Sequence, residues 1–521
     1  MGYRLGIDVG GTNTDAVVLD EEHRVLAKAK TPVSRDVVSG IRAVVAEVLQ
    51  KSGVDPAAVT HAMLGTTQVT NAIIERRGLA PVAILRLGAP ATRAVGPLAA
   101  WPSDLREKVE GPSAILPGGV EYDGRPISAF DAEAVRRFVR EALDQGFRAF
   151  AVTGVFSPVR NDDELHAAEI IEHEAGGEAV LSLSYEIGSV GLLERENAAV
   201  LNAAVSGVAA RVTEAFRAAL ESLDVRAELF LSQNDGTLMS LDYARRYPIL
   251  TVACGPTNSI RGAAFLSRRR DAVVVDVGGT STDVGVLVSG FPRESAVAVE
   301  IGGVRTNFRM PDLISIGLGG GSRVRLEAGE LRVGPESVGS AILEEAQVFG
   351  GRTLTMTDVV VARGMASLGD PKRVTAEAGL LEAAFRKAVA MVEEAVDRIK
   401  TSAAPVPVVA VGGGSILLPD RLEGASEIDR PEHYEVANAI GAAIAQVSGT
   451  VDRIFSLEQR SREAALSEAR ESAFAEAVRA GADPKTVEVI EVEEVPLAYL
   501  PGNAVRVKVK AAGRLRGVEV S

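Results

Sequence analysis

Short apolar runs alternate with amphipathic segments along the first third of the chain. Residues 3–7 and 16–19 are largely apolar runs of strand length on either side of a glycine-rich turn, which predicts a β-hairpin. Apolar residues recur every three or four positions across residues 37–51, as in an amphipathic helix. This alternation is typical of α/β proteins. Further strands are expected near residue 63 and at 82–85 and 149–155, and further helices at 68–77, 131–145 and 162–174.

The second half of the chain repeats the opening pattern. Residues 272–275 and 284–288 flank another glycine-rich turn, and a helical stretch at 187–223 is expected to open the second domain. Further helices are expected at 376–401 and 435–446, with a strand at 406–411 between them. Beyond residue 451, a charged helix (457–480) and two β-rich segments (487–495 and 504–509) predict a small α+β unit.

These patterns predict three units. The domains are expected at residues 1–186, 187–450 and 451–521. Residues near 89–125 are rich in glycine and proline and lack periodicity, so they are expected to form an insertion in the first domain.

The two glycine-rich turns have almost the same sequence. Asp8 to Asp15 reads Asp-Val-Gly-Gly-Thr-Asn-Thr-Asp, and Asp276 to Asp283 differs from it only by Ser281 in place of Asn13. A hairpin turn by itself needs no repeated aspartate at both ends. The repetition therefore indicates two similar domains, each with a loop that performs chemistry.

The composition of these loops suits phosphate. Phosphate sites need converging backbone N–H groups, room for the ligand and short hydroxyl side chains. Glycines permit close approach, and threonines supply hydroxyls. We therefore expect ATP to bind here, through Gly10, Gly11, Thr12, Asn13, Thr14, Gly278, Gly279, Thr280, Ser281 and Thr282.

The aspartates predict a cation. Asp8 and Asp276 end apolar strands, where an uncompensated carboxylate would be costly. Mg²⁺ prefers oxygen ligands and retains waters, so it would compensate both charges. Asp8, Asp15, Asp276 and Asp283 are the candidate catalytic residues; spacing alone does not choose which one orients an attacking group.

Two further glycine clusters are ambiguous. Gly412, Gly413 and Gly414 follow an apolar strand and are read either as a loop against adenosine or as a plain strand-to-helix turn. Residues 317–322 superficially resemble a dinucleotide fingerprint, but Ser322 replaces its last glycine. Small residues at 70–72 and 437–442 indicate either a close helix crossing at a hinge or ordinary packing.

Composition narrows the class of protein. The chain has 521 residues, 46% of them hydrophobic and 24% charged, and no apolar run of roughly twenty residues, so no membrane span is expected. No secretory signal pattern is visible, so a cytoplasmic location is expected. A net charge of −14 argues against nucleic acid. The single cysteine, Cys254, favours a buried packing role over a nucleophile.

Several segments resemble one family. Residues 7–15, 64–72, 276–283, 315–322, 334–339 and 355–358 are similar to motifs of the hydantoinase/oxoprolinase family, specifically its A subunit, within the superfamily of acetate and sugar kinases, Hsp70 and actin. The resemblance spans about residues 1–448. It implies two actin-like (ribonuclease H-like) ATPase domains with ATP in the cleft between them, and nucleotide contacts from Thr66 and Thr67.

The resemblance also implies an activity. Members of this family use ATP to phosphorylate a carbonyl oxygen of the substrate. The resemblance therefore implies that the chain is an ATP-dependent hydrolase subunit acting on a hydantoin, an oxoproline or a related cyclic amide. Leu64 stands where longer members have His, which places the chain with the shorter branch. That branch implies a second, hydantoinase B-like subunit and an oligomer. The alternatives are a small-molecule kinase and a non-catalytic ATP switch.

Overall fold

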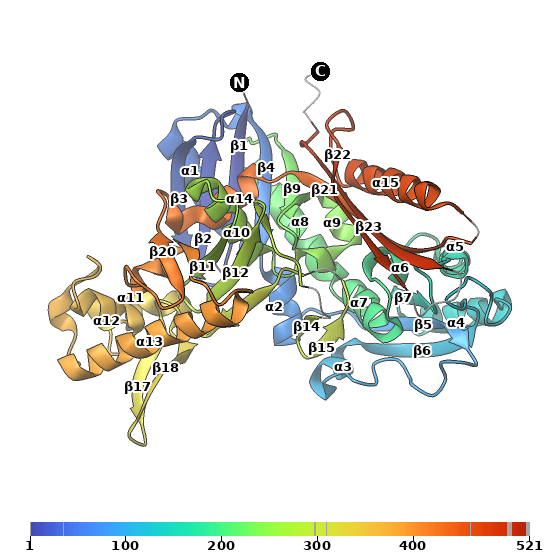
Figure 1. Ribbon diagram of the computed structural model, residues 1–521, viewed down its shortest axis with the longest axis horizontal. Coiled ribbons are helices and arrows are strands. Elements are labelled where there is room, and N and C mark those ends of the chain that lie inside the picture. The colour runs from blue at the N-terminus through green and yellow to red at the C-terminus, as the bar shows by residue number, and fades with distance from the viewer. Residues whose placement is uncertain are drawn as a thin grey trace.

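A computed structural model describes residues 2–34, 36–295, 299–308, 310–458, 460–497 and 503–516. In these residues the strands form a nine-stranded, a six-stranded and a four-stranded sheet and two separate hairpins. Figure 1 shows the four-stranded sheet at lower right and the helices α11 to α13 at lower left. No helix in the described ranges is long and apolar enough to cross a bilayer.

The first predicted hairpin lies inside the nine-stranded sheet. β1 pairs antiparallel with β2 and parallel with β4, and β4 pairs parallel with β9. α1 begins after Asp36, whose carboxylate accepts the Ser39 N–H, and it buries its apolar stripe against β2 and β3. These elements are β1 (Tyr3–Val9), β2 (Asn13–Leu19), β3 (Val25–Pro32), α1 (Val37–Ser52), β4 (Val59–Thr66) and β9 (Glu228–Ser232).

The second hairpin heads an equivalent sheet. β11 pairs antiparallel with β12 and parallel with β19, β19 pairs parallel with β20, and β16 pairs with β12. The order β16-β12-β11-β19-β20 thus repeats β3-β2-β1-β4-β9. The prediction of two related actin-like α/β domains is confirmed. The elements are β11 (Ala272–Val277), β12 (Thr282–Val288), β13 (Phe291–Pro292), β16 (Leu313–Ile316), α12 (Met356–Ala362), α13 (Ala378–Ile399), β19 (Val406–Val411) and β20 (Ala425–Asp429).

The insertion in the first domain is larger than the expected residues 89–125. It is a four-stranded parallel sheet of order β6-β5-β7-β8 with its own apolar core. The aperiodic segment contributes α3 and β6. Gly111, Pro112 and Pro117 lie within β6, and the other glycines and prolines of the segment lie in the loops around these two elements. The elements are β5 (Val82–Ala89), α3 (Ser103–Val109), β6 (Glu110–Pro117), α4 (Ala132–Asp144), β7 (Ala149–Gly154), α5 (Asp162–Ala175), β8 (Val180–Leu183) and α6 (Ser184–Ile187).

The expected domain boundary at residues 186 and 187 does not coincide with the division between sheets. The helical stretch at 187–223 forms α7 (Leu192–Ala204) and α8 (Ser206–Glu221), and α8 packs on α1 of the first domain. β9 then joins β4. Helical periodicity shows that a face is buried but not which surface buries it, so the pattern could not assign these helices.

The C-terminal unit contains the predicted helix and strands, and it extends the first sheet. β21 pairs in parallel with the short β10 at Leu238 and Val447, and β23 and β22 follow outward. A buried ion pair, Lys510 Nζ to Asp235 Oδ2 at 2.7 Å, joins β23 to the loop before β10. The elements are β10 (Leu238–Ser240), α9 (Leu241–Arg246), β21 (Val447–Ser456), α15 (Arg462–Arg479), β22 (Glu488–Pro496) and β23 (Ala504–Gly513).

Two helices cross closely between the domains. α14 packs on α10, and a Cβ atom on Gly262 of α10 would lie 1.9 Å from the carbonyl oxygen of Ala437 in α14. The close crossing expected of residues 437–442 is therefore present, with α10 as the partner. The remaining elements are α2 (Gln68–Glu75), α10 (Cys254–Ser267), β14 (Val299–Ile301), β15 (Val304–Thr306), β17 (Ser322–Glu327), β18 (Glu330–Ser337), α11 (Ile342–Glu345) and α14 (Ala437–Ile444).

Candidate functional site

The two repeated loops face one cavity of about 480 Å³ between the two related domains. Both loops fold identically: Gly10 N–H donates to the Asn13 carbonyl at 3.0 Å, and Gly278 N–H donates to the Ser281 carbonyl at 2.9 Å. The predicted residues that line the cavity are Asp8, Gly10, Gly11, Thr12, Asn13, Asp15, Thr67, Asp276, Gly278, Gly279, Thr280, Ser281, Asp283, Gly412, Gly413 and Gly414.

The loops of the two domains touch each other. A Cβ atom on Gly279 would lie 2.8 Å from the Thr12 side chain, so only glycine fits there without displacing Thr12. At Gly11, by contrast, a Cβ atom would meet nothing within 4 Å, which leaves its backbone open to the cavity. The loops therefore present backbone N–H groups and hydroxyls from opposite sides of one space, as a polyphosphate requires.

The four aspartates form two cross-strand pairs. Asp8 lies directly opposite Asp15 on β1 and β2, and Asp276 lies directly opposite Asp283 on β11 and β12. Like charges directly opposite each other in a sheet repel. Each domain thus presents a repulsive carboxylate pair to the cleft, and the two pairs lie close enough for Asp276 to act on the pKa of Asp8.

The first pair is compensated in part by neighbouring side chains. Asn438, at the start of α14, donates to Asp8 Oδ2 at 2.9 Å and to Asp15 Oδ2 at 3.0 Å, and Lys30 Nζ lies 2.7 Å from Asp15 Oδ1. Burial first, and then the Asp15 charge, nevertheless raise the pKa of Asp8 to about 7. The protein alone does not stabilise a full negative charge on Asp8.

The second pair lies at the wall of the cleft. Burial raises the pKa of Asp276, against the opposing effects of a hydrogen bond from Ser259 and the Lys30 charge. Burial and the Asp276 charge raise the pKa of Asp283 to about 6, although a hydrogen bond from Ser315 lowers it. Both carboxylates would therefore gain from a nearby cation.

The residues present fit a magnesium ion. Asp8 Oδ1 is buried and has no hydrogen-bond partner within the described part of the chain, which leaves an oxygen free to coordinate. In that same part, no three His, Cys, Asp or Glu side chains form a complete metal cage. Mg²⁺ is commonly held by one or two carboxylates with waters and phosphate oxygens, so a complete protein cage is not required.

The third glycine cluster lines the cavity next to the second repeated loop. Gly412 has φ 82°, and a Cβ atom there would lie 2.2 Å from Asp276 Oδ1. Position 412 therefore requires glycine, because any side chain would collide with the aspartate. The place of this cluster on the cavity wall is compatible with the adenosine interpretation, which stays a prediction. The apolar side chains that line the cavity are Ile342, Leu343, Phe349, Leu368 and Ile416.

The segment 317–322 supports the second loop. Gly320 N–H donates to the Gly278 carbonyl at 3.0 Å, and Gly321 N–H donates to the Gly279 carbonyl at 2.8 Å. A Cβ atom on Gly319 would lie 2.6 Å from Thr280 N. These glycines allow close backbone contact with the phosphate loop and do not form a dinucleotide fingerprint.

Three predicted nucleotide contacts lie outside the cavity lining. Thr14 and Thr282 are buried between residues that do line it, because neighbouring side chains of a strand point to opposite faces. Thr282 Oγ1 donates to the Leu318 carbonyl at 2.6 Å, and Thr66 Oγ1 accepts the Gln68 N–H at 3.3 Å. The hydroxyls of Thr282 and Thr66 thus bond to the protein backbone.

The sequence interpretation missed several residues at the cleft. Lys30 lies opposite Asp15 on β3, a position that strand pairing could have indicated. Asn438 and Ser259 come from α14 and α10, distant in sequence from the loops, and no local signal marks them. Cys254 is buried at the start of α10, and burial raises its thiol pKa to about 12, in keeping with a packing role.

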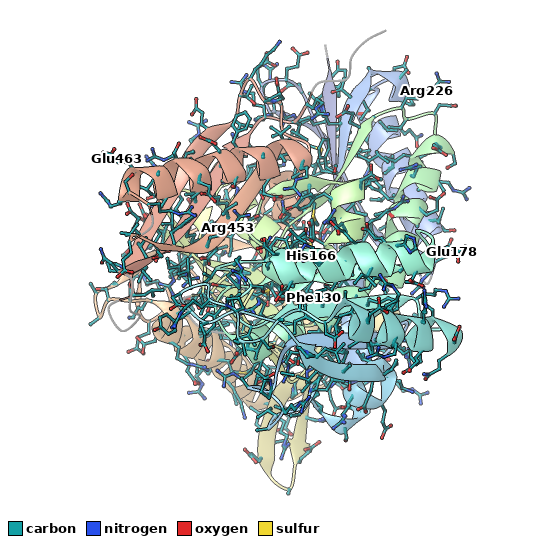
Figure 2. All side chains as sticks on the ribbon, turned by 90° about the vertical axis from the view of Figure 1, so that its right-hand side faces the viewer. Phe130, His166, Glu178, Arg226, Arg453 and Glu463 are labelled. Atoms are coloured by element: carbon teal, nitrogen blue, oxygen red, sulfur yellow. The ribbon has the colours of Figure 1, made fainter. Side chains whose placement is uncertain are left out.

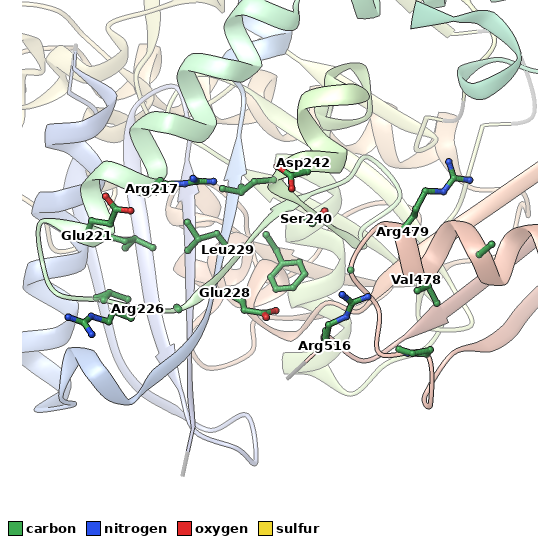
Figure 3. A pocket seen from close by; sticks show the side chains of 18 of the residues that line it. Arg217, Glu221, Arg226, Glu228, Leu229, Ser240, Asp242, Val478, Arg479 and Arg516 are labelled. Atoms are coloured by element: carbon green, nitrogen blue, oxygen red, sulfur yellow. The ribbon is translucent and has the colours of Figure 1, made fainter. Parts of the chain in front are cut away.

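A larger hollow lies elsewhere. A groove of about 1350 Å³ runs between the end of α8, β9 and α15. Figure 3 shows charges of both signs around it, including Arg217, Arg226, Glu221 and Asp242. None of the predicted site residues lines this groove, so size alone does not mark the chemical site.

The fold and cleft define a class of protein. Two copies of one sheet topology, facing each other through a repeated phosphate loop, are the architecture of the actin, sugar kinase and Hsp70 class. Within that class the chain belongs to the hydantoinase/oxoprolinase family. Residues 4–175 match the hydantoinase/oxoprolinase N-terminal region, and residues 195–367 match the hydantoinase/oxoprolinase domain.

Curated relatives and solved structures agree with this assignment. The chain is 26% identical over 389 residues to the acetophenone carboxylase gamma subunit of Aromatoleum aromaticum, covering 69% of this chain and 53% of that one. It is 26% identical over 417 residues to caprolactamase subunit alpha of Pseudomonas jessenii, covering 73% and 57%. The chain thus spans about half the length of these relatives.

The fold is shared over almost the whole chain. An ATP-dependent caprolactamase from Pseudomonas jessenii superimposes with a TM-score of 0.77 at 20% identity, covering 99% of this chain and 88% of that one. An acetone carboxylase structure without nucleotide gives 0.69 at 15% identity, with the same coverage.

Proposed function

We propose that the chain is the ATP-using part of an enzyme that hydrolyses a cyclic amide, such as a hydantoin, an oxoproline or a lactam. The observation that carries this proposal is the pair of facing loops with four aspartates on one interdomain cavity. The names of the relatives, a caprolactamase subunit and 5-oxoprolinases among them, indicate the substrate class.

ATP would transfer its γ-phosphoryl group to the amide oxygen, with ADP as the leaving group, which makes the amide carbon electrophilic. Attack by water would then break the C–N bond and release phosphate, leaving the ring-opened acid and its free amine. Backbone N–H groups of Gly11 and Gly279 would hold the phosphates, while those of Gly10 and Gly278 close the two hairpin turns. Asp8 and Asp276 would hold Mg²⁺, whose charge would offset the two repulsive carboxylate pairs. Asp15 and Asp283 remain the candidates to orient the attacking group.

The cleft also limits side reactions. It lies between two domains that contact each other through α10 and α14, and both helices contribute cavity-lining residues, Ser259 and Asn438. Closure around the substrate would exclude water that otherwise hydrolyses ATP without ring opening.

We also propose that a second subunit completes the enzyme, because two of the relatives are themselves named as subunits. A cytoplasmic location, where ATP is available, fits this role.

The experiment measures ATP hydrolysis and ring opening with hydantoin, 5-oxoproline and caprolactam. Each assay is run with and without the proposed second, hydantoinase B-like subunit. We expect ADP and the ring-opened acid to appear together and to require Mg²⁺. A phosphorylated product without ring opening would instead indicate a small-molecule kinase. Slow ATP hydrolysis that no cyclic amide stimulates, with or without the partner, would indicate an ATP switch and contradict the proposal.

A further inference from the structure

A second cavity, of about 470 Å³, shares no lining residue with the nucleotide cleft. Loops that follow β6, β7 and β8 form one wall, and β21 with the start of α15 forms the other. The three strands belong to the parallel four-stranded sheet, so these loops lie at its carboxyl edge. Open α/β sheets bind small ligands at that edge.

The cavity lies between the inserted sheet and the C-terminal unit. Figure 2 shows Arg453 of β21 between α15 and α5, the helix that carries His166. Asn161, the residue before α5, and Glu468 of α15 line the same cavity. A ligand there would contact two units that are far apart in the sequence.

The cavity is positively charged in an acidic protein. Four arginines line it, against two carboxylates, Asp123 and Glu468, while the whole chain has a net charge of −14. The arginines come from three separate segments: Arg125 after β6, Arg160 after β7, and Arg453 and Arg460 in and after β21.

Two of these guanidinium groups already have close protein partners. Arg125 Nε donates to Asp123 Oδ2 at 2.6 Å, and Arg460 pairs closely with Glu468. Their charges are largely satisfied, and they complete the wall of the cavity.

The other two guanidinium groups are weakly paired. Arg160 Nε is buried and lies 3.4 Å from Asp162 Oδ2, but this contact does not have hydrogen-bond geometry, so the N–H has no hydrogen-bond acceptor in the part of the chain that the structure describes. Arg453 approaches Glu468 only to 3.8 Å. A buried N–H without an acceptor is costly, and a guanidinium suits a carboxylate or a phosphate with two parallel hydrogen bonds.

Apart from Asp162, the acids in the first turn of α5 are engaged elsewhere. Asp163 Oδ2 accepts the Gly119 N–H at 2.7 Å, and Glu164 is buried and accepts the Gly154 N–H at 2.7 Å. Neither residue lines the cavity. Ser157, Asn161 and Tyr185 do, and they add neutral hydrogen-bonding groups.

We propose that this cavity binds a small dianion through a carboxylate or phosphate group held between Arg160 and Arg453. Because the two arginines lie on the inserted sheet and on the C-terminal unit, the bound ligand ties these two units together. The site is separate from the nucleotide cleft and does not depend on the activity proposed above.

The test is calorimetric titration of the full chain with succinate and, separately, with inorganic phosphate. A non-hydrolysable ATP analogue and Mg²⁺ are added at saturation in the phosphate titration, so that the γ-phosphate position at the glycine loops is filled as well. We expect one site per chain and binding that weakens as salt is added. Arg160→Gln and Arg453→Gln should each lower the affinity about tenfold or more.

Two further variants make the result specific. Arg453→Lys keeps the charge but loses the planar fork, so it should bind with intermediate affinity. Arg245→Gln is the matched control, because Arg245 has a similarly exposed side chain (37%, against 39% and 38% for Arg160 and Arg453) and a weak ion pair outside the cavity. It should bind like the unaltered protein. Circular dichroism establishes that each variant is folded.

The probes also separate the ligand classes. Binding of phosphate alone supports a phosphate ester, and binding of succinate alone supports a dicarboxylate. No saturable binding of either anion, or equal affinity in the unaltered protein and the Arg160 and Arg453 variants, overturns the proposal.

Discussion

Replacing Gly441 by alanine tests whether α10 and α14 must touch for the cleft to form. A Cβ atom at this position in α14 would lie 1.9 Å from the carbonyl oxygen of Asn258 and 2.9 Å from Gly262 N, both in α10. Nonbonded heavy atoms rest about 3.5 Å apart, so the helices would have to separate by more than about 1 Å. The clash is with backbone, so no side-chain rotation relieves it.

Two effects are expected from Gly441→Ala. Overpacking of this kind costs about 1–3 kcal/mol, which should appear as a lower free energy of unfolding in urea, followed through Trp101 fluorescence and circular dichroism. Separation of the helices would also move Ser259 and Asn438 relative to the four aspartates. Misplacement of about 1 Å should lower ATP turnover tenfold or more.

Gly379→Ala is the matched control. Gly379 lies in the first turn of α13, is exposed, and would place a Cβ atom with nothing within 4 Å. The same chemical change should therefore stabilise the protein, by about 0.5–1 kcal/mol, because alanine favours the helix. If Gly441→Ala unfolded at the same urea concentration as the unaltered protein and turned over ATP equally fast, the argument from the helix crossing would be refuted.

Three other predictions follow from single residues. Asn438→Leu removes the amide that donates to both Asp8 and Asp15, so the free energy of unfolding measured in urea should fall by about 2 kcal/mol or more. An unchanged value would contradict the role of Asn438 as their shared donor. Burial raises the pKa of the Cys254 thiol to about 12, so a thiol reagent should label the native protein slowly. Labelling should be slower still when ATP and Mg²⁺ are bound, and rapid labelling of the native protein would show that the thiol is not buried. Burial alone would raise the pKa of Asp235, but Lys510 and the Thr237 hydrogen bonds lower it to about 2. The ionised carboxylate therefore stabilises the fold above about pH 4, and this stabilisation is lost as the pH falls toward 2. Asp235→Asn should therefore cost about 2 kcal/mol at pH 5 and less at pH 3 in urea titrations, and a cost that grows at pH 3 would contradict the sign.

Local patterns predicted much of the cleft correctly. The doubled loop and the strands on each side of it follow from short segments, because turn chemistry and strand periodicity act over a few residues. The same periodicity, applied more strictly, excludes Thr14 and Thr282 from the cavity. The expectation that these two threonines contact nucleotide weighed residue type without the alternation of strand faces.

Contacts between distant segments could not be predicted in this way. Asn438 reaches Asp8 across 430 residues of sequence, and Lys510 reaches Asp235 from the C-terminal unit. The helical stretch at 187–223 has the expected periodicity but packs on the first domain. An amphipathic pattern states that one face must be buried; which surface is free to cover it depends on how the whole chain packs.

The sequence alone therefore determined the class of protein, because Asp-x-Gly-Gly-Thr-x-Thr-Asp occurs twice and each copy folds locally into the same hairpin. Only the tertiary structure decided that the two copies face each other, that Asn438 and Lys30 complete the site, and that the last strands extend the first sheet. The physical reason is that hairpin formation depends on neighbouring residues, whereas sheet extension and helix crossing depend on surfaces that exist only once the domains have folded.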